Sequence, residues 1–141
     1  MSYTHNVTVS LSYEEAVTRT REALAEHGFG VLTEIDVHAT FDNKLGAEAA
    51  EAVGDYIILG ACNPTLASKA LAAEPELGAL LPCNVVVRRG AGDDRTTIET
   101  IDPQTMVKLG ESDRVREVAD DADARLQAAL SDIAAGSDAG A

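Results

Sequence analysis

Hydrophobic and polar residues alternate at two places near the start of the chain, which is typical of half-buried strands. These segments are residues 5–11 (HNVTVSL) and residues 29–37 (FGVLTEIDV). Between them Ser12, followed three positions later by Glu15, forms the pattern of a capping box and predicts the start of a helix. Gly28 is the expected left-handed residue at the end of that helix. The chain therefore begins with a strand, a helix and a second strand.

An uninterrupted apolar run in the middle of the chain predicts a third strand. Residues 56–61 (YIILGA) lack the alternation of a half-exposed strand, so we expect a central strand that is covered on both faces. The connection before it, residues 39–53, is helical or irregular. Asn63 and Pro64 predict a helix start, because Asn accepts free backbone N–H groups and Pro needs no donor at the first helical position.

The second half of the chain predicts a strand over residues 80–89, a turn over 90–94 and a second strand over 95–101. A final amphipathic helix is predicted over residues 113–133. No repeat or linker divides the chain, and it has no glycine-rich phosphate loop. We therefore predict an α+β fold in one compact domain over residues 1–135, with a mainly antiparallel sheet packed against helices. A disordered tail is expected over residues 136–141.

The composition is strongly acidic, with 24 acidic and 11 basic side chains and a formal net charge of −13. Such a surface repels phosphate backbones and anionic lipids, so we expect no nucleic-acid partner and no membrane partner. The acidic residues are spread along the chain and only three lysines occur, a balance that predicts a halophilic protein. No segment has the pattern of a membrane span or signal peptide, which favours a soluble cytoplasmic protein.

Two Cys-Asn pairs are the most unusual candidates for chemistry. Cys62 precedes the predicted helix start at Asn63, where the helix dipole can stabilise a thiolate. Cys83 and Asn84 repeat the pair at the start of a strand. If the two thiols meet, they form a disulfide, a dithiol or half of a metal site; otherwise they are small core residues. A closed zinc site would need two more ligands besides the two thiols. Only the carboxylates and three histidines could supply them, namely His5, His27 and His38.

A second candidate cluster follows the strand at residues 29–37. Asp36, His38 and Lys44 carry a carboxylate, an imidazole and an amine, and these groups could converge at the mouth of a cleft. The simpler alternative is a solvated strand face and a surface amine. No nucleophile elbow, zinc-protease motif or calcium loop occurs, so the sequence assigns no catalytic residue, no cofactor and no metal ligand.

Several segments together resemble the domain-of-unknown-function 302 family of bacteria and archaea. They are GFGVLTEIDV, YIILGACNPTLASKAL and LLPCNVVV, and the similarity extends over nearly the whole chain. The resemblance implies a curved antiparallel sheet backed by helices, and a homodimer, but no established activity. The residues at its motif positions are Asp36, Lys44, Gly60, Cys62, Asn63, Pro64, Pro82, Cys83 and Asn84.

Three hypotheses for function follow. The first is a domain that binds a small ligand or metal in a cleft near the two Cys-Asn segments, with these candidate site residues: Asp36, Lys44, Cys62, Asn63, Cys83 and Asn84. The second is a thiol-based redox protein or enzyme that uses Cys62 and Cys83. The third is a purely structural dimerisation module. We rank the ligand-binding hypothesis first.

Overall fold

The computed structural model describes residues 2–109 and 112–139. Its centre is a five-stranded sheet in the order β1-β5-β4-β3-β2, in which every neighbouring pair is antiparallel. The strands β1 to β5 are, in chain order, Thr4–Val9, Gly30–Asp36, Asp55–Cys62, Cys83–Arg89 and Thr96–Ile101. The antiparallel pairing and the helices around the sheet confirm the predicted α+β fold in one compact domain.

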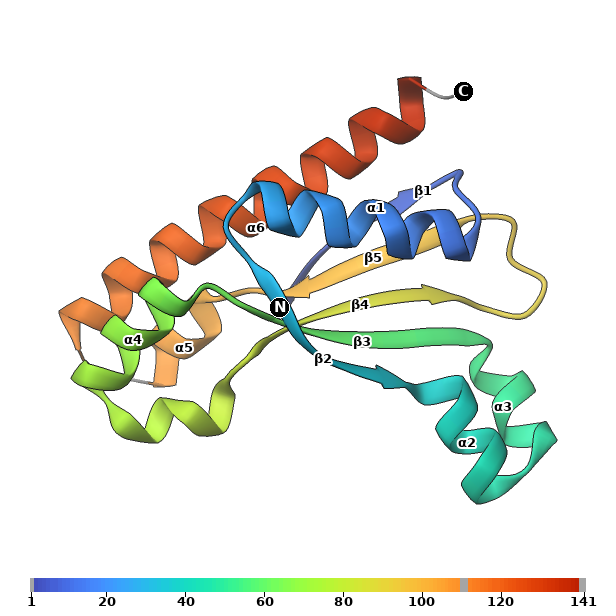
Figure 1. The fold of residues 1–141 in the computed structure, drawn as a ribbon, viewed down its shortest axis with the longest axis horizontal. Coiled ribbons are helices and arrows are strands. Elements are labelled where there is room, and N and C mark those ends of the chain that lie inside the picture. The colour runs from blue at the N-terminus through green and yellow to red at the C-terminus, as the bar shows by residue number, and fades with distance from the viewer. Residues whose placement is uncertain (1, 110–111, 140–141) are drawn as a thin grey trace.

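In the described residues six α-helices and one 3₁₀ helix surround the sheet. The helices α1 to α6 are, in chain order, Tyr13–Glu26, Val37–Leu45, Ala47–Val53, Pro64–Ala73, Gln104–Leu109 and Asp113–Ala139, and the 3₁₀ helix η1 is Pro75–Leu80. Helices α1 and α6 pack against each other, α1 also against β4, β5 and β2, and α6 also against β1. Figure 1 shows α4 and α5 beside the first turns of α6, and the pair α2 and α3 at the opposite end of the sheet.

Side-chain caps begin two of these helices where the sequence predicted them. The Ser12 hydroxyl accepts a hydrogen bond from the backbone N–H of Glu15, at 3.2 Å, and begins α1. The Asn63 carboxamide oxygen accepts one from the N–H of Leu66, at 3.0 Å, and begins α4 with Pro64 in its first turn. Both caps satisfy backbone donors that lack a partner inside the helix.

The buried side chains form two clusters that meet along α6. The larger lies between the sheet, α1 and the second half of α6, and includes Leu24, Leu59, Val85 and Leu126. The smaller lies among α4, η1, α5 and the first half of α6: Leu66, Ala70, Leu77, Met106, Val115, Val118 and Ala122. Small aliphatic side chains fill both clusters, so helices and sheet approach closely despite the low aromatic content.

The connection before β3, expected to be helical or irregular, consists of two helices, α2 and α3. One local expectation was wrong. Strand β3 is not covered on both faces, because Ile57 and Leu59 face the helices and are buried whereas Tyr56 and Ile58 on the other face are only partly buried. Helix α6 continues to Ala139, and residues 140–141 of the expected tail lie outside the described residues.

Arg19 of α1 contacts the C-terminal part of α6. The Arg19 guanidinium donates a hydrogen bond to the backbone oxygen of Asp132 at 3.5 Å. The same guanidinium covers Gly136, where an added Cβ would lie 2.8 Å from the Arg19 Nη2 atom. Arg19 therefore links α1 to α6 at residues 132 and 136.

Candidate functional site

The two cysteines lie at the same end of neighbouring strands. Ala61 of β3 pairs with Cys83 of β4, so Cys62 follows one residue beyond that pair. Both thiols are free and both line a small apolar cavity of about 40 Å³. The cavity is enclosed by the ends of β3 and β4, by α4 and by α6. The structure therefore brings the two cysteines together, as the sequence allowed.

Burial controls the chemistry of the inner thiol. Cys83 is 8% exposed. This burial, together with a smaller contribution from Cys62, raises the pKa of Cys83 to about 11. The Cys83 thiol is therefore protonated at neutral pH and is a poor nucleophile. Cys62 is only partly buried and is the more accessible of the two.

A close backbone approach supports the cysteine end of the sheet. A Cβ at Gly60 would lie 2.1 Å from the Thr33 Oγ1 atom and 2.9 Å from the Pro82 Cγ atom. Because no side chain can occupy that distance, only glycine fits where β2 and the loop before β4 meet over β3. Gly60 and Pro82 therefore have a packing role beside the cavity.

The asparagines of the two Cys-Asn pairs, Asn63 and Asn84, lie in different surroundings. Asn63 lines the cavity while it caps α4, and its amide nitrogen would lie 3.0 Å from a Cβ at Gly28. Gly28 itself has a φ of +90°, which favours glycine. Asn84 is exposed and, by strand alternation with Cys83, lies on the sheet face away from the helices. Asn63 thus belongs to the cavity and Asn84 does not.

The second predicted cluster lies elsewhere. The Asp36 carboxylate accepts a hydrogen bond from the backbone N–H of Ala39 at 2.9 Å and caps α2. The His38 Nδ1 atom lies 2.8 Å from the backbone oxygen of Gly54, and Lys44 is an exposed residue in the last turn of α2. The depression beside His38 is lined by neither Asp36 nor Lys44. These groups lie at the α2 end of the sheet, opposite the cysteines (Figure 1).

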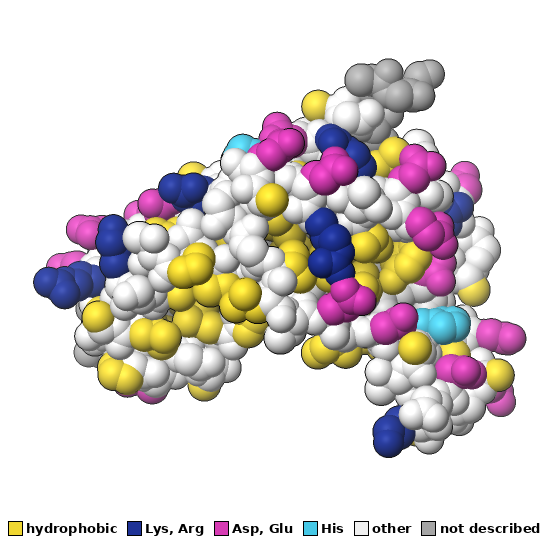
Figure 2. All heavy atoms as spheres, in the orientation of Figure 1, with side chains coloured by type: hydrophobic (Ala, Val, Ile, Leu, Met, Phe, Trp, Pro, Cys, Tyr) yellow, Lys and Arg dark blue, Asp and Glu magenta, His cyan; other side chains and the backbone are white. Residues whose placement is uncertain are grey.

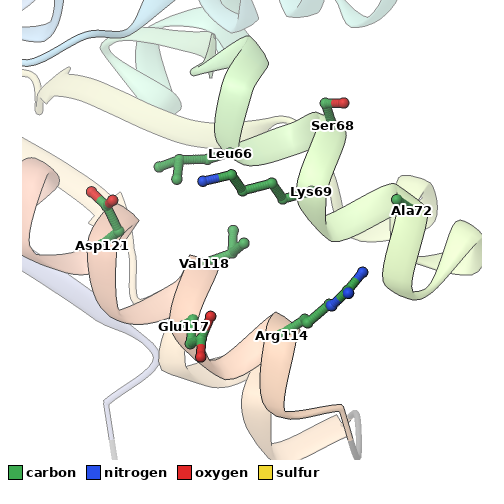
Figure 3. A pocket seen from close by; sticks show the side chains of 8 residues that line it. All are labelled: Leu66, Ser68, Lys69, Ala72, Arg114, Glu117, Val118 and Asp121. Carbon is green, nitrogen blue, oxygen red and sulfur yellow. The ribbon is translucent and has the colours of Figure 1, made fainter.

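A larger groove next to the cysteine cavity was not predicted. It has a volume of about 570 Å³ and lies between α4 and α6, as Figure 3 shows. Lys69 extends from α4 and Arg114 from α6, so cationic groups come from both walls. Within the described part of the chain, neither cation forms an ion pair or a side-chain hydrogen bond. Of the two acidic groups in the lining, Asp121 is held by Arg125 at 2.6 Å.

The groove continues toward the cysteines. Leu66 and Val118 line both the groove and the small cavity, so the cavity lies beneath the floor of the groove. Figure 2 shows hydrophobic side chains gathered on the α4 side of the molecule, whereas acidic side chains are spread over α1, α6 and the α2–α3 end. The lining from α6 has the spacing of one helical face, which was visible in the sequence: Arg114, Glu117, Val118 and Asp121.

The same architecture occurs in a solved structure, that of an uncharacterised conserved protein DUF302 from Bacillus stearothermophilus. The two chains are 28% identical and superpose with a TM-score of 0.81, over 95% of this chain and 99% of the other. The family model described as Domain of unknown function DUF302 matches residues 5–133. The chain belongs to the DUF302 family. This confirms the resemblance carried by the two Cys-Asn segments, whereas no curated protein matches the chain.

In this DUF302 protein one face of the sheet is left largely uncovered by the helices of the described residues. Ile35, Ile58 and Val86 form a row across β2, β3 and β4 on that face. Ile35 is 50% exposed, and Leu32 at the irregularity in β2 is 68% exposed. No helix in the described residues has both the length and the apolar character needed to cross a membrane. The open face therefore carries a row of apolar side chains that the helices of the described residues leave partly exposed.

Proposed function

We propose that this protein binds a small molecule that carries an anionic group and a short apolar part, in the groove between α4 and α6. The observation that carries the proposal is the pair Lys69 and Arg114, two cations without ion-pair partners in the described structure, which extend from opposite walls of one groove. In a chain with a net charge of −13, two such cations in one concave site favour a carboxylate or a similar anion.

The apolar part of the ligand is accommodated below the cations. Leu66 and Val118 form the shared wall between the groove and the cavity that contains Cys62 and Cys83. The cavity has room for a small apolar group, and its lining offers few polar atoms. Cys62 and Asn63 then lie at the inner end of the site, which places the first Cys-Asn pair next to the ligand.

The test is a titration with hexanoate, compared with hexanol as an uncharged chain of the same length. We expect hexanoate to bind and to raise the melting temperature, and hexanol to bind at least tenfold more weakly. Lys69→Gln and Arg114→Gln should each weaken hexanoate binding about tenfold, because each removes one charge-assisted contact. Lys44→Gln is the matched control, since it removes the same charge from α2, outside the groove.

Two results would contradict this proposal. The first is equal binding of hexanoate and hexanol, which would leave the cations without a role. The second is a loss of binding in Lys44→Gln with normal binding in Lys69→Gln, which would move the site to the α2 end. Alkylation of Cys62 provides a second readout, because a ligand in the groove should slow the reaction of Cys62 with iodoacetamide.

We also propose that the open sheet face is the contact between two copies of the chain. The row Ile35, Ile58 and Val86 supports this proposal, because an exposed apolar sheet face is typical of an interaction surface. On the same face Arg88 and Glu99 form an ion pair at 3.2 Å, which offers complementary charges to a second copy. A dimer formed through this face would leave the α4–α6 groove open.

Sedimentation equilibrium tests the dimer. The unmodified protein should sediment as a dimer, and Ile35→Lys should sediment as a monomer because it places a charge in the apolar row. Leu45→Lys is the matched control: Leu45 is 68% exposed but belongs to α2, so this variant should remain a dimer. A monomeric unmodified protein at micromolar concentration, or a dimeric Ile35→Lys variant, would refute this contact.

A further inference from the structure

Three side chains with potential metal-ligand atoms, from distant parts of the chain, meet at the edge of the sheet. His5 lies in β1, Asp102 directly follows β5, and Asp123 lies on α6. The His5 Nε2 atom is 2.8 Å from the Asp123 Oδ1 atom and 3.5 Å from the Asp102 Oδ1 atom. One ligand atom from each of the three residues lies within 4.8 Å of the other two.

We propose that His5, Asp102 and Asp123 form a binding site for a divalent transition-metal ion. One imidazole nitrogen and two carboxylate oxygens are a donor set that Mn²⁺, Fe²⁺ and Zn²⁺ accept in proteins. All three side chains are partly buried, between 18% and 29% exposed, so their positions are restricted by the surrounding structure. The ion would join the edge strand β1 to β5 and α6.

The charges of the cluster favour a dication. Two carboxylates face one imidazole, and in the described structure neither Asp102 nor Asp123 forms an ion pair with an arginine or a lysine. Each carboxylate is oriented by a further donor. The backbone N–H of Gln104 donates to Asp102 Oδ1 at 2.9 Å, and the side-chain amide of Gln127 donates to Asp123 Oδ1 at 3.1 Å. Such outer hydrogen bonds hold ligands in place in metal sites.

Solvent has access to the cluster from one side. An open depression of about 390 Å³ is lined by residues that include His5, Asn6 and Gln127. Of the three ligands only His5 lines this depression, but all three side chains are partly exposed, so water can fill the coordination positions that three protein ligands leave free, as in an open metal site. The thiols are not part of it, because Cys62 and Cys83 line a different cavity.

The chain contains a matched control for this proposal. The His27 Nε2 atom lies 2.7 Å from the Asp132 carboxylate and links α1 to α6, so it resembles the His5 pair in distance and partner. It has only one carboxylate, however, and belongs to no group of three ligands in the described structure. A general affinity of histidine–aspartate pairs for metal would affect His27 as much as His5.

The experiment is a titration of the metal-free protein with Co²⁺, whose visible absorption reports protein ligands, followed by displacement with Zn²⁺. We expect one Co²⁺ per chain in the unmodified protein and in His27→Gln. His5→Gln and Asp123→Asn should each weaken binding at least tenfold.

Controls separate this proposal from its alternatives. Circular dichroism of each metal-free variant shows whether it folds, and Asp102→Asn replaces any variant that does not. Cys62→Ser should bind Co²⁺ normally and show no change in its spectrum. The proposal is overturned if the unmodified protein binds no Co²⁺, if His27→Gln loses as much affinity as His5→Gln, or if the Co²⁺ spectrum depends on Cys62.

Discussion

At the scale of single residues, burial distinguishes two thiols that have the same neighbour in sequence. Cys83 begins β4 and faces the helices, so its thiol is removed from water and its pKa rises to about 11. Cys62 lies beyond the last pair of β3 and remains partly exposed in the lining of the small cavity. A redox cycle needs a thiolate to attack and a second thiol to resolve. A protonated, buried Cys83 favours a role for Cys62 in lining a site over a role for the pair in redox chemistry.

The raised pKa of Cys83 predicts a pH-dependent stability. The usual pKa of this thiol is 9.0. Below that pH the folded and unfolded chains both keep the proton, so the thiol adds no pH dependence to the free energy of unfolding. Above it the unfolded chain releases the proton while the folded chain keeps it up to about pH 11. The free energy of unfolding therefore falls as the pH rises through this interval, by about 1 kcal/mol between pH 7.5 and 9.5.

Urea unfolding at the two pH values measures this effect. Cys83→Ala should lose stability at both pH values, since it leaves a small void, but its fall between them should be smaller than that of the unmodified protein by about 1 kcal/mol. The comparison of slopes cancels every other group that titrates in the same range. Parallel slopes for the two proteins would show that burial does not hold the Cys83 proton.

At the scale of elements, local signals were sufficient for much of the fold. Ser12 and Asn63 marked helix starts because a capping side chain acts on backbone groups within three residues. The alternation in β1 and the hairpin between β4 and β5 were also readable from short segments. The coverage of β3 was not, because an apolar run is the same whether a helix or a second copy of the chain covers its other face.

The sites are formed by contacts between residues that are far apart in the chain, and the sequence does not show which of these residues meet. Asp36 and Lys44 were predicted as site residues together with Cys62. They lie at the α2 end of the sheet, however, and Cys62 lies at the other end. Conversely, His5 meets Asp123 only because β1 returns to the edge beside β5 and under α6. The α4–α6 groove likewise exists only after two helices from different halves of the chain pack together. Periodicity identifies such faces but not which faces meet.

At the scale of the whole molecule, the acidic surface opposes the compact state. Five arginines form ion pairs with carboxylates in the described structure, but those pairs leave the excess of acidic groups, and the net charge of −13, unchanged. Some of the acidic side chains also lie near the C-terminal ends of helices. Glu26 is exposed in the last turn of α1 and Glu51 is exposed near the end of α3, where the helix dipole disfavours negative charge. Repulsion of this kind extends over about 30 Å in 10 mM salt and about 3 Å in 1 M salt.

We therefore expect the melting temperature to rise as KCl is increased from 10 mM to 1 M. In 10 mM KCl the variant Glu26→Gln/Glu51→Gln should be more stable than the unmodified protein by about 0.5–2 kcal/mol, because each change removes an unfavourable charge from a helix end. This difference should vanish in 1 M KCl, where the charges are screened. The control is Glu22→Gln, which removes a charge paired with Arg19 at 3.3 Å and should give no gain in low salt. A melting temperature that falls as KCl is raised would show that screening of the acidic surface does not stabilise the fold. It would thereby remove the physical basis for a salt-adapted protein.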